Sequence, residues 1–563
     1  MRADEFAGEV DGWSQSGGPF DPVLLTAHDE AETFPTEACA ALDRWGLPDY
    51  YVPSRFGGRL ARLDEVHALL RTVASRDVTV AVAHGKTFLG SVSVWAAGEG
   101  EPATSLARHV MAGEAVAWGL TEPGGGSDLL AGELTATRQG SGWRLSGRKW
   151  PVNNATRGRF VCVLARTDPG GGPRGFSVFL VDKRATAPGT VRYLPKMPTH
   201  GIRGADISGV EFLDTQVPDH ALIGTVGGGL ELVLKSLQLT RVGCVALSLG
   251  AGDHALRIAR RFLGERRLHG RRFSELPHAR TVAGRSVARL LLAETVAYTA
   301  ARSAHEVPEE LSAVSAITKA LVPTLIQGQL RLVGELLGAR GFLTGVEGYG
   351  GFAKIERDHQ IVGIFDGSTW VNRSALASSL PVLRPGRRRP AASTGAPVHE
   401  WLREDHEPAA LDPLRLGVMA RDNTVLSSLG DLVTRLAVDP PDGADRMAAR
   451  LLDAYGELSG RISDLRPVAA GPPLTAAMRL AERYEWCHAG AAALALWVAN
   501  PQHHDRDWWR DGLWLRGCLA LVLEGLGAPP SEATATFDEL GSLLLGDAGD
   551  RVSLLGTPVE VSA

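Results

Sequence analysis

Residues 357–368 read Arg357-Asp358-His359-Gln360-Ile361-Val362-Gly363-Ile364-Phe365-Asp366-Gly367-Ser368. They place a carboxylate, Asp366, between an apolar run and a Gly-Ser turn. A carboxylate on such a turn can be partly desolvated, as a general base requires. The competing interpretation is structural, because Asp-Gly-Ser is also ordinary turn chemistry that caps a following helix. Taken alone, the stretch favours a helix cap over a general base. The choice therefore depends on the rest of the sequence.

Composition sets the outer bounds on the class of protein. The 563 residues leave room for three or four domains of roughly 150 residues each, and 44% hydrophobic content is typical of a globular chain. A net charge of -5 gives no reason to expect nucleic acid or an anionic membrane as the main partner.

Cysteine usage and the apolar runs indicate where the protein works. The five cysteines lie far apart without a CxxC pair, which favours reduced thiols in a cytoplasmic protein and no metal site. The first residues are acidic and lack the apolar core of a secretion signal. No run approaches 18 apolar residues, so we expect no membrane span.

The pattern of apolar and turn-forming residues changes three times along the chain. We expect a helical domain over residues 1–115, a β-domain over 116–225 and a helical bundle over 226–383. Within the bundle, 287–306 and 316–338 carry the broad apolar face of long helices. The β-domain shows several short strand-like runs at the spacing of an antiparallel sandwich or barrel.

A Pro-, Gly- and Arg-rich stretch over 384–399 predicts a linker, and residues 400–563 predict an additional helical domain. Trp508, Trp509 and Trp514 stand near Arg510 and Arg516 in that domain. Such a cluster could receive an acidic acyl-carrier protein, but tryptophans at helical spacing are more often core. We therefore expect a packing role.

Two further segments could carry chemistry. Thr121-Glu122-Pro123-Gly124-Gly125-Gly126-Ser127-Asp128 is a glycine loop whose backbone N–H groups could approach a cofactor or phosphate, although a plain glycine turn is the simpler interpretation. Gly147-Arg148-Lys149-Trp150-Pro151-Val152-Asn153-Asn154-Ala155 is placed between two strands, as a hairpin loop with a buried tryptophan. Neither matches a P-loop or a Rossmann fingerprint.

Taken in order, these segments resemble the acyl-CoA dehydrogenase family. The resemblance covers roughly residues 20–382: Thr-Glu-Pro-x-x-Gly-Ser-Asp, then Gly-x-Lys after a β run, then Arg-Asp and Asp-Gly-Ser near the end of a helical region. Smaller pieces agree, at 237–241, 266–270 and 337–342. The fold this implies is mostly α with a middle β-domain: an N-terminal helical domain, a β-barrel or sandwich, and a C-terminal four-helix bundle, here with an extra helical domain.

The resemblance also implies FAD as cofactor and assigns positions to it. By carry-over, Thr121 contacts the flavin ring, Asn153 and Asn154 lie along it, and Ser127 meets a cofactor phosphate or the substrate thioester. Across a homodimer or homotetramer, the FAD of one subunit would meet residues of its neighbour. The resemblance also assigns cofactor contacts to Arg266, Gly338, Gly341 and Ser368. It assigns substrate contacts to Arg241 and Gly367.

The implied reaction is α,β-dehydrogenation of an acyl thioester, acyl-CoA or acyl-carrier protein, with an electron-transfer flavoprotein or oxygen as acceptor. Asp366 occupies the position of the α-proton-abstracting base, which is usually Glu. Pro151 stands where the family has a tryptophan beside the flavin. These departures leave two alternatives open: a flavin oxidase or monooxygenase, similar to nitroalkane oxidase, and a catalytically inactive scaffold. The divergent motifs favour a role in specialised metabolism.

Overall fold

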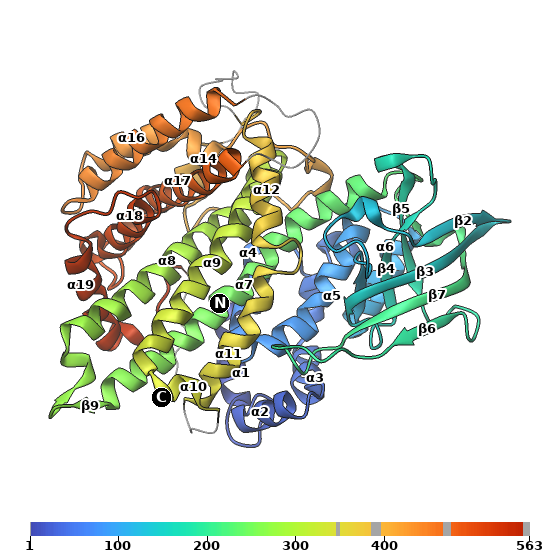
Figure 1. The fold of residues 1–563 in the computed structure, drawn as a ribbon, viewed down its shortest axis with the longest axis horizontal. Helices are drawn as coiled ribbons and strands as arrows, with labels where there is room; N and C mark the ends of the chain where they lie inside the picture. The colour runs from blue at the N-terminus through green and yellow to red at the C-terminus, as the bar shows by residue number, and fades with distance from the viewer. Residues whose placement is uncertain (1, 345–348, 384–395, 466–474, 556–563) are drawn as a thin grey trace.

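The computed structural model describes residues 2–344, 349–383, 396–465 and 475–555. It is mostly helical, with one sheet at an end of the molecule (Figure 1). The N-terminal helices are α1 (Arg2–Trp13), α2 (Pro22–Glu30), α3 (Thr36–Trp45), α4 (Leu63–Ala74), α5 (Val78–Ala96) and α6 (Glu101–Met111).

The β-domain is a single eight-stranded sheet in the order β6-β7-β3-β2-β4-β5-β8, with β1 beside β4. Most neighbours are antiparallel, as predicted, but β1 and β2 both run parallel to β4. The strands are β1 (Val116–Gly119), β2 (Thr135–Gln139), β3 (Gly142–Asn153), β4 (Phe160–Arg166), β5 (Phe176–Asp182), β6 (Val191–Leu194), β7 (Ile207–Pro218) and β8 (Leu222–Ile223).

One sequence interpretation of this sheet is wrong. The segment 147–155 is not a hairpin loop between two strands, because β3 continues through Asn153 and pairs with β7. The register shifts between Leu145 and Gly147 and again between Lys149 and Val152. These two bulges bring the glycine and the proline into a strand that would not otherwise admit them. Trp150 is half-buried rather than buried.

Long helices form the central bundle: α7 (Gly229–Glu265), α8 (Pro277–Glu306), α9 (Leu311–Leu337), α10 (Ala339–Phe342), α11 (Gly350–His359) and α12 (Thr369–Ser379). A two-stranded hairpin, β9 (Arg267–Leu268) and β10 (Arg271–Arg272), joins α7 to α8. α8 and α9 begin earlier in the chain than the apolar pattern predicted, because their first turns also lie against other elements.

Two helical stretches among the described residues, Gly229–Glu265 and Pro308–Leu337, have the length and composition to cross a membrane. Their most apolar windows are 83% and 78% buried inside the protein, respectively. A helix at the centre of a bundle is apolar on every side because it is buried on every side. The length and composition of these two helices are therefore weak evidence for a membrane span. All five cysteines are buried free thiols.

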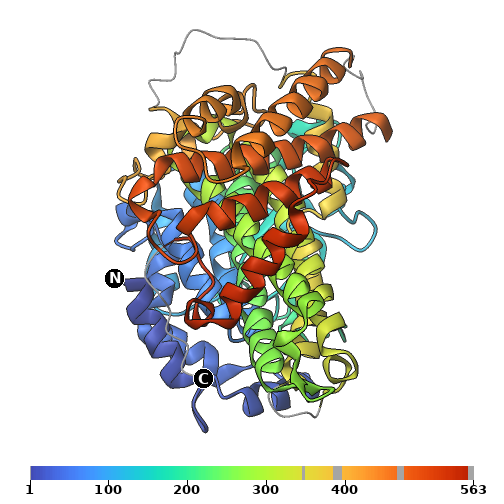
Figure 2. The ribbon, with the colours of Figure 1, turned by 90° about the vertical axis from the view of Figure 1, so that its left-hand side faces the viewer.

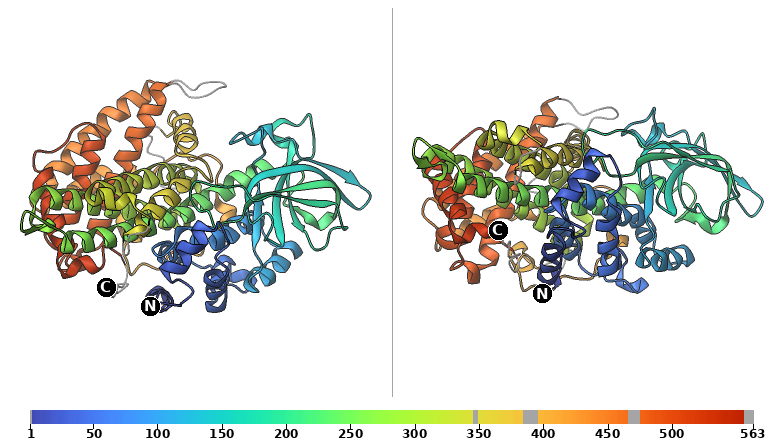
Figure 3. Two further views of the ribbon diagram at one scale, coloured as in Figure 1. Left: turned by 60° about the horizontal axis from the view of Figure 1, so that its bottom comes forward. Right: turned by 90° about the horizontal axis from the view of Figure 1, so that it is seen from below.

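Most of the predicted linker, residues 384–395, lies outside the described residues. Beyond it the chain forms α13 (Val398–Trp401), α14 (Thr424–Ser427), α15 (Leu429–Leu436), α16 (Ala444–Ser463), α17 (Thr475–Ala499), α18 (Leu513–Gly525) and α19 (Ala533–Leu545), which we call the extension. Figure 2 shows it as a layer over the bundle helices. The extension and the sheet occupy opposite ends of the long axis (Figure 3).

The tryptophans of the extension are core residues, as predicted. Trp509 and Trp514 are 1% and 0% exposed and pack edge to face, with ring centroids 5.1 Å apart. Trp508 is also buried, and its ring N–H donates to the carbonyl of Arg551 at 2.6 Å. These contacts leave no indole face available as a docking platform.

The extension docks on the bundle where α19 crosses α8. A Cβ on Gly541 would lie 2.0 Å from the carbonyl oxygen of Arg280, and one on Gly284 would lie 1.8 Å from that of Phe537. The two backbones therefore touch, and each helix needs glycine at the crossing point. An ion pair from Arg285 to Glu524 of α18 lies beside it.

We expect Gly541→Ala to separate α19 from α8, because no flexible side chain there can yield to the added methyl. Overpacking of this kind costs about 1–3 kcal/mol. The midpoint of urea unfolding, followed by the fluorescence of the extension tryptophans, should fall. Gly456→Ala in α16 is the matched control, since its Cβ meets nothing within 4 Å, and it should leave the midpoint unchanged or raise it. Equal midpoints for both variants would contradict the close-contact account.

The pH dependence of stability follows from three buried histidines. Burial lowers the pKa of His67 and of His359 to about 3 and that of His488 to about 4. The ordinary histidine pKa is about 6.5, so below that pH the unfolded chain binds protons that the folded chain does not. The contribution of each of these histidines to stability should therefore fall as the pH drops below about 6.5, by up to about 1.4 kcal/mol per pH unit. Glu310 and Glu485, whose pKa burial raises to about 7, act in the opposite direction.

Urea unfolding at pH 7, 6 and 5 measures this slope. His359→Gln keeps a polar group between Ser248 and Gln327, which contact the two imidazole nitrogens at 3.0 and 2.9 Å. This variant should lose about one histidine's share of the slope. An unchanged slope would mean that His359 is not buried in its neutral form.

Candidate functional site

Asp366 lies on the turn between the 3-10 helix Gln360–Gly363 and α12. Its backbone φ is 54°, and that of Gly367 is 89°, so two consecutive residues adopt the left-handed region. The hydroxyl of Ser368, rather than Asp366, caps α12 by accepting the N–H of Val371 at 3.2 Å. The interpretation of Asp366 as the cap of α12 is therefore wrong. Its side chain does not cap the helix.

The Asp366 carboxylate faces Lys86 of α5. The Lys86 Nζ lies 3.4 and 3.3 Å from the two carboxylate oxygens, and the side chains are 15% and 8% exposed, respectively. The same ammonium lies 3.7 Å from the ring centroid of Phe365. Lys86 is the only Lys, Arg, Asp or Glu in α5, and this lone charge in an apolar helix was a signal that sequence reasoning overlooked.

Two further cations hold the backbone of the turn. Arg241 of α7 donates its Nε–H to the carbonyl of Asp366 at 3.2 Å. Lys319 of α9 donates to the carbonyls of Val362 at 2.6 Å and Gly367 at 3.1 Å. Burial lowers the pKa of Arg241 to about 10 and also lowers that of Lys319, although the charge of Asp366 opposes both shifts.

The charges of this cluster are unbalanced. Lys86, Arg241 and Lys319 surround one carboxylate, and the neighbouring Cys244 stays a thiol because burial raises its pKa to about 12. Asp366 is the one acid within this cluster of described residues, which makes it the candidate proton acceptor here.

The glycine loop lies beside a buried ion pair. Lys149 donates to Glu122 at 2.6 Å and to the Leu120 carbonyl at 3.1 Å. Glu122 in turn accepts the N–H groups of Glu133 and Leu134 at 2.7 and 3.1 Å. Both ends of the loop are thereby fixed to the sheet, and its centre stays accessible.

Two cofactor positions from the sequence lie on this loop. The carbonyl of Thr121 accepts the N–H of Trp150 at 2.9 Å, and its side chain is half-buried. Ser127 is exposed at the far side of the loop. The structure therefore places both on a surface that a ligand can reach.

Asn153 and Asn154 join the sheet to α5. Their side-chain amides donate to the carbonyls of Val82 at 3.2 Å and Ala83 at 3.1 Å. The Oδ1 of Asn153 is buried and has no hydrogen-bond partner. An unpaired buried oxygen is costly, so it indicates a missing N–H or O–H donor at this point. The helix that carries Lys86 is thus tied directly to the strand that carries the predicted cofactor residues.

Arg266, Gly338 and Gly341 lie elsewhere, at the ends of α7 and α9. Tyr349 links this region: it donates to Glu265 at 2.5 Å, and the Arg340 guanidinium lies 5.7 Å from its ring centroid. In Figure 1 the β9 hairpin is at the opposite side of the molecule from the sheet. One copy of the chain therefore does not bring these residues to Asn153.

The comparisons with known proteins agree with this arrangement. Residues 117–215 match the family model of the acyl-CoA dehydrogenase middle domain, and residues 227–380 match that of the C-terminal domain. A probable acyl-CoA dehydrogenase of Mycobacterium tuberculosis is 26% identical over 353 residues, which are 62% of this chain and 89% of the relative. Cyclohex-1-ene-1-carbonyl-CoA dehydrogenase of Geobacter metallireducens is 27% identical over 377 residues, 62% of this chain and 91% of that protein.

Among solved structures, butyryl-CoA dehydrogenase of Megasphaera elsdenii has a TM-score of 0.61 and 21% identity, covering 67% of this chain and 96% of its own. An acyl-CoA dehydrogenase of Bacillus anthracis, solved with FAD, has a TM-score of 0.72 and 16% identity. It covers 97% of this chain and 95% of its own, so the extension also has a counterpart in fold. From these matches, residues 117–215 and 227–380 are acyl-CoA dehydrogenase middle and C-terminal domains, and the architecture of the chain is the acyl-CoA dehydrogenase fold.

Proposed function

We propose that this protein is an FAD-dependent dehydrogenase that introduces an α,β double bond into an acyl thioester, with Asp366 as the acceptor of the α-proton. The observation that carries the proposal is the Asp366 turn. A single carboxylate is held at a fixed backbone position by Arg241 and Lys319, with its oxygens turned toward α5. Sequence relatives named for CoA thioesters support a thioester substrate, carried by CoA or by an acyl-carrier protein.

The residues present fit FAD. The unpaired Oδ1 of Asn153 is an acceptor for a flavin ring N–H, and the Thr121 and Ser127 hydroxyls lie on the neighbouring loop. Asn154 and Ser368 are already engaged, one with α5 and one with the α12 cap, so they support the site rather than contact the ring. The chemistry that FAD supplies when bound is acceptance of the β-hydrogen as hydride.

The chain's own residues account for the proton. Asp366 takes the α-proton onto a carboxylate oxygen, and Lys86 parts from that oxygen as the substrate enters. The N–H of Asp366 donates to the thioester oxygen, where negative charge develops. Arg241 keeps the turn in place through the Asp366 carbonyl. Gly367 lets Asn372 and Arg241 pack against the turn, because a Cβ there would lie 3.0 Å from Asn372 and 3.3 Å from Arg241.

We also propose an oligomeric state and an electron acceptor. Arg266, Gly338 and Gly341 lie away from Asn153, which supports a homodimer or homotetramer in which one subunit completes the cofactor site of another. We expect an electron-transfer flavoprotein or oxygen as electron acceptor, and oxygen uptake during turnover distinguishes them. A cytoplasmic location and a role in specialised metabolism remain predictions from the sequence.

Asp in place of the usual Glu also favours a second candidate, a flavin oxidase or monooxygenase related to nitroalkane oxidase. Mixing the protein with an acyl thioester under nitrogen separates the two. Bleaching of the flavin supports dehydrogenation, whereas a requirement for an external reductant supports a monooxygenase. Bleaching by a nitroalkane but not by a thioester supports the oxidase.

Asp366→Asn should slow anaerobic flavin reduction by an acyl thioester by about 10²–10⁴-fold, the usual contribution of a positioned base. The amide keeps the size of the side chain but cannot accept the proton. Asp431→Asn on α15, an exposed carboxylate in an ion pair with Arg435, is the control and should keep the parent rate. The base assignment fails if Asp366→Asn reduces flavin at the parent rate.

Asn153→Ala should weaken FAD binding by about tenfold, since it removes one hydrogen bond to the ring. The visible absorbance of the protein titrated with FAD measures this affinity. Thr137→Ala, an exposed position in the same sheet, should bind FAD like the parent protein. If the parent shows no flavin bands even with added FAD, the inactive-scaffold alternative is correct.

A further inference from the structure

Lys86 and Asp366 form a loose ion pair. The Lys86 Nζ lies 3.4 and 3.3 Å from the two carboxylate oxygens, whereas a charge-assisted N–H···O bond is usually about 2.7–2.9 Å long. An ammonium has three N–H donors, and the Lys86 side chain keeps 15% of its surface exposed. A closer acceptor could therefore compete with Asp366 for this cation.

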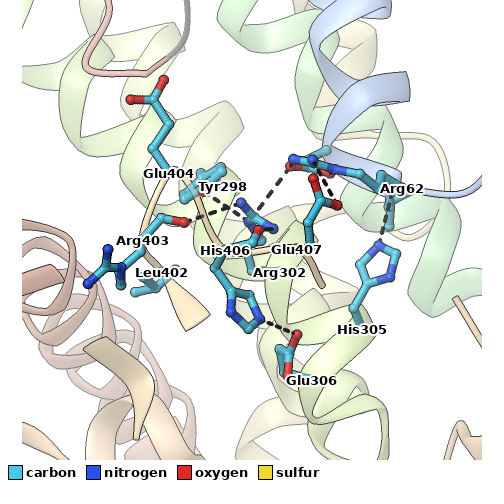
Figure 4. Close-up of polar contacts among 12 residues, drawn as sticks. Arg62, Tyr298, Arg302, His305, Glu306, Leu402, Arg403, Glu404, His406 and Glu407 are labelled. Carbon is cyan, nitrogen blue, oxygen red and sulfur yellow. Dashed lines mark hydrogen bonds and ion pairs between the residues drawn. The ribbon is translucent and has the colours of Figure 1, made fainter. Parts of the chain in front are cut away.

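The most buried cations outside the candidate site each have an acid within ion-pair distance. Among the described residues, Lys149 and Arg302 are 1% and 0% exposed. Lys149 donates to Glu122 at 2.6 Å, and the Arg302 guanidinium lies 3.7 Å from Asp64. Figure 4 shows the neutral acceptors around Arg302: the Tyr298 hydroxyl and two backbone carbonyls of the extension, at 2.9, 2.9 and 3.4 Å. The chain itself thus supplies partners for both cations.

In the cluster around Asp366 the positive charges are in excess. Three cations, Lys86, Arg241 and Lys319, surround its single carboxylate, and Cys244 adds no negative charge because it is a buried thiol. Lys319 is 0% exposed and donates to backbone carbonyls, with no acid at ion-pair distance among the described residues. Three cations against one carboxylate leave an excess of positive charge, which is costly at low exposure unless an anion offsets it.

We propose that a carboxylate on the acyl part of the substrate offsets this charge, and that Lys86 binds it. The substrate class is then a dicarboxylic acyl thioester rather than a plain fatty acyl thioester. This inference rests on the proposed function, because it takes Asp366 as the acceptor of the α-proton. Lys86 faces the side-chain oxygens of Asp366 rather than its backbone N–H. It is therefore placed for a group on the acyl chain, whereas the thioester oxygen receives the backbone N–H.

The same contact couples substrate binding to release of the base. Asp366 has to free one oxygen for the α-proton, and this breaks its contact with Lys86. An ammonium of low exposure that loses its partner is unfavourable. A substrate carboxylate gives Lys86 a new partner as the α-carbon comes within about 3 Å of the Asp366 oxygen. A plain acyl chain offers no such exchange, so the ion pair resists its entry.

The test compares thioesters of equal acyl length, succinyl-CoA with butyryl-CoA and adipyl-CoA with hexanoyl-CoA, on the FAD-loaded, full-length protein. The second-order rate of flavin reduction under nitrogen should favour the dicarboxylic member in at least one pair. Lys86→Met should lower that preference by about 10- to 100-fold, the range for one hydrogen bond to a charged group. Lys86→Arg keeps the charge and should retain the preference. Arg435→Met, which removes an exposed cation on α15, is the control and should keep the parent ratio.

Two readouts separate this inference from the dehydrogenase proposal. Flavin reduction reports the chemistry, and the rise in unfolding temperature caused by each thioester reports binding. If no thioester reduces the flavin but dicarboxylic thioesters stabilise the parent more than Lys86→Met, the anion site stands and the reaction assignment fails. The anion site is overturned if the parent favours the plain member of both pairs. It is also overturned if Lys86→Met, with flavin content intact, slows both members of each pair equally. Neither result contradicts the dehydrogenase proposal.

Discussion

The Nζ of Lys319 is buried beneath the Asp366 turn and donates to the carbonyls of Val362 and Gly367. A buried ammonium without these two acceptors would be strongly destabilising. The turn can therefore move only if the cation also loses its partners. Arg241 adds the same constraint from α7. Three helices, α5, α7 and α9, thus fix one short turn, and the position of the Asp366 carboxylate depends on their packing.

The extension matters for this site because it contacts the same helices. Arg373 of α12, the helix that follows the turn, pairs with Glu485 of α17 at 2.8 Å. Burial raises the pKa of Glu485 to about 7, and the charge of Arg373 opposes that shift. The extension also contacts α7, where Gln238 donates to the Gly417 carbonyl at 2.7 Å. The extension therefore holds α12 behind the turn, although it supplies no residue to the Asp366 cluster.

The order of motifs along the chain predicted the fold and located Asp366, because each motif depends on local backbone demands such as glycine turns and strand ends. Lys86 and Lys319 could not be found that way. Each lies on a long apolar helix, and its partner is remote in sequence, so only the packed bundle brings them together. The sequence did not predict that β3 continues, because Gly147 and Pro151 are typical of strand ends. Only the pairing with β7, which is remote in sequence, shows that they lie at bulges within the strand. The hydroxyl of Ser368 takes the capping role, so the structure rules out Asp366 as the cap of α12.

Asp366, which is shorter than the usual Glu, and Lys86, which faces it, form one arrangement. Asp places its carboxylate one methylene closer to the backbone than Glu, so the substrate must approach the turn more closely. Lys86 lies opposite the carboxylate on α5, and Arg241 and Lys319 hold the backbone of the turn. In the proposed reaction, these three cations would lie near the negative charge that develops on the thioester oxygen. An enolate-like transition state would then be held by groups that already lie in place, which is the arrangement that lowers a barrier most effectively.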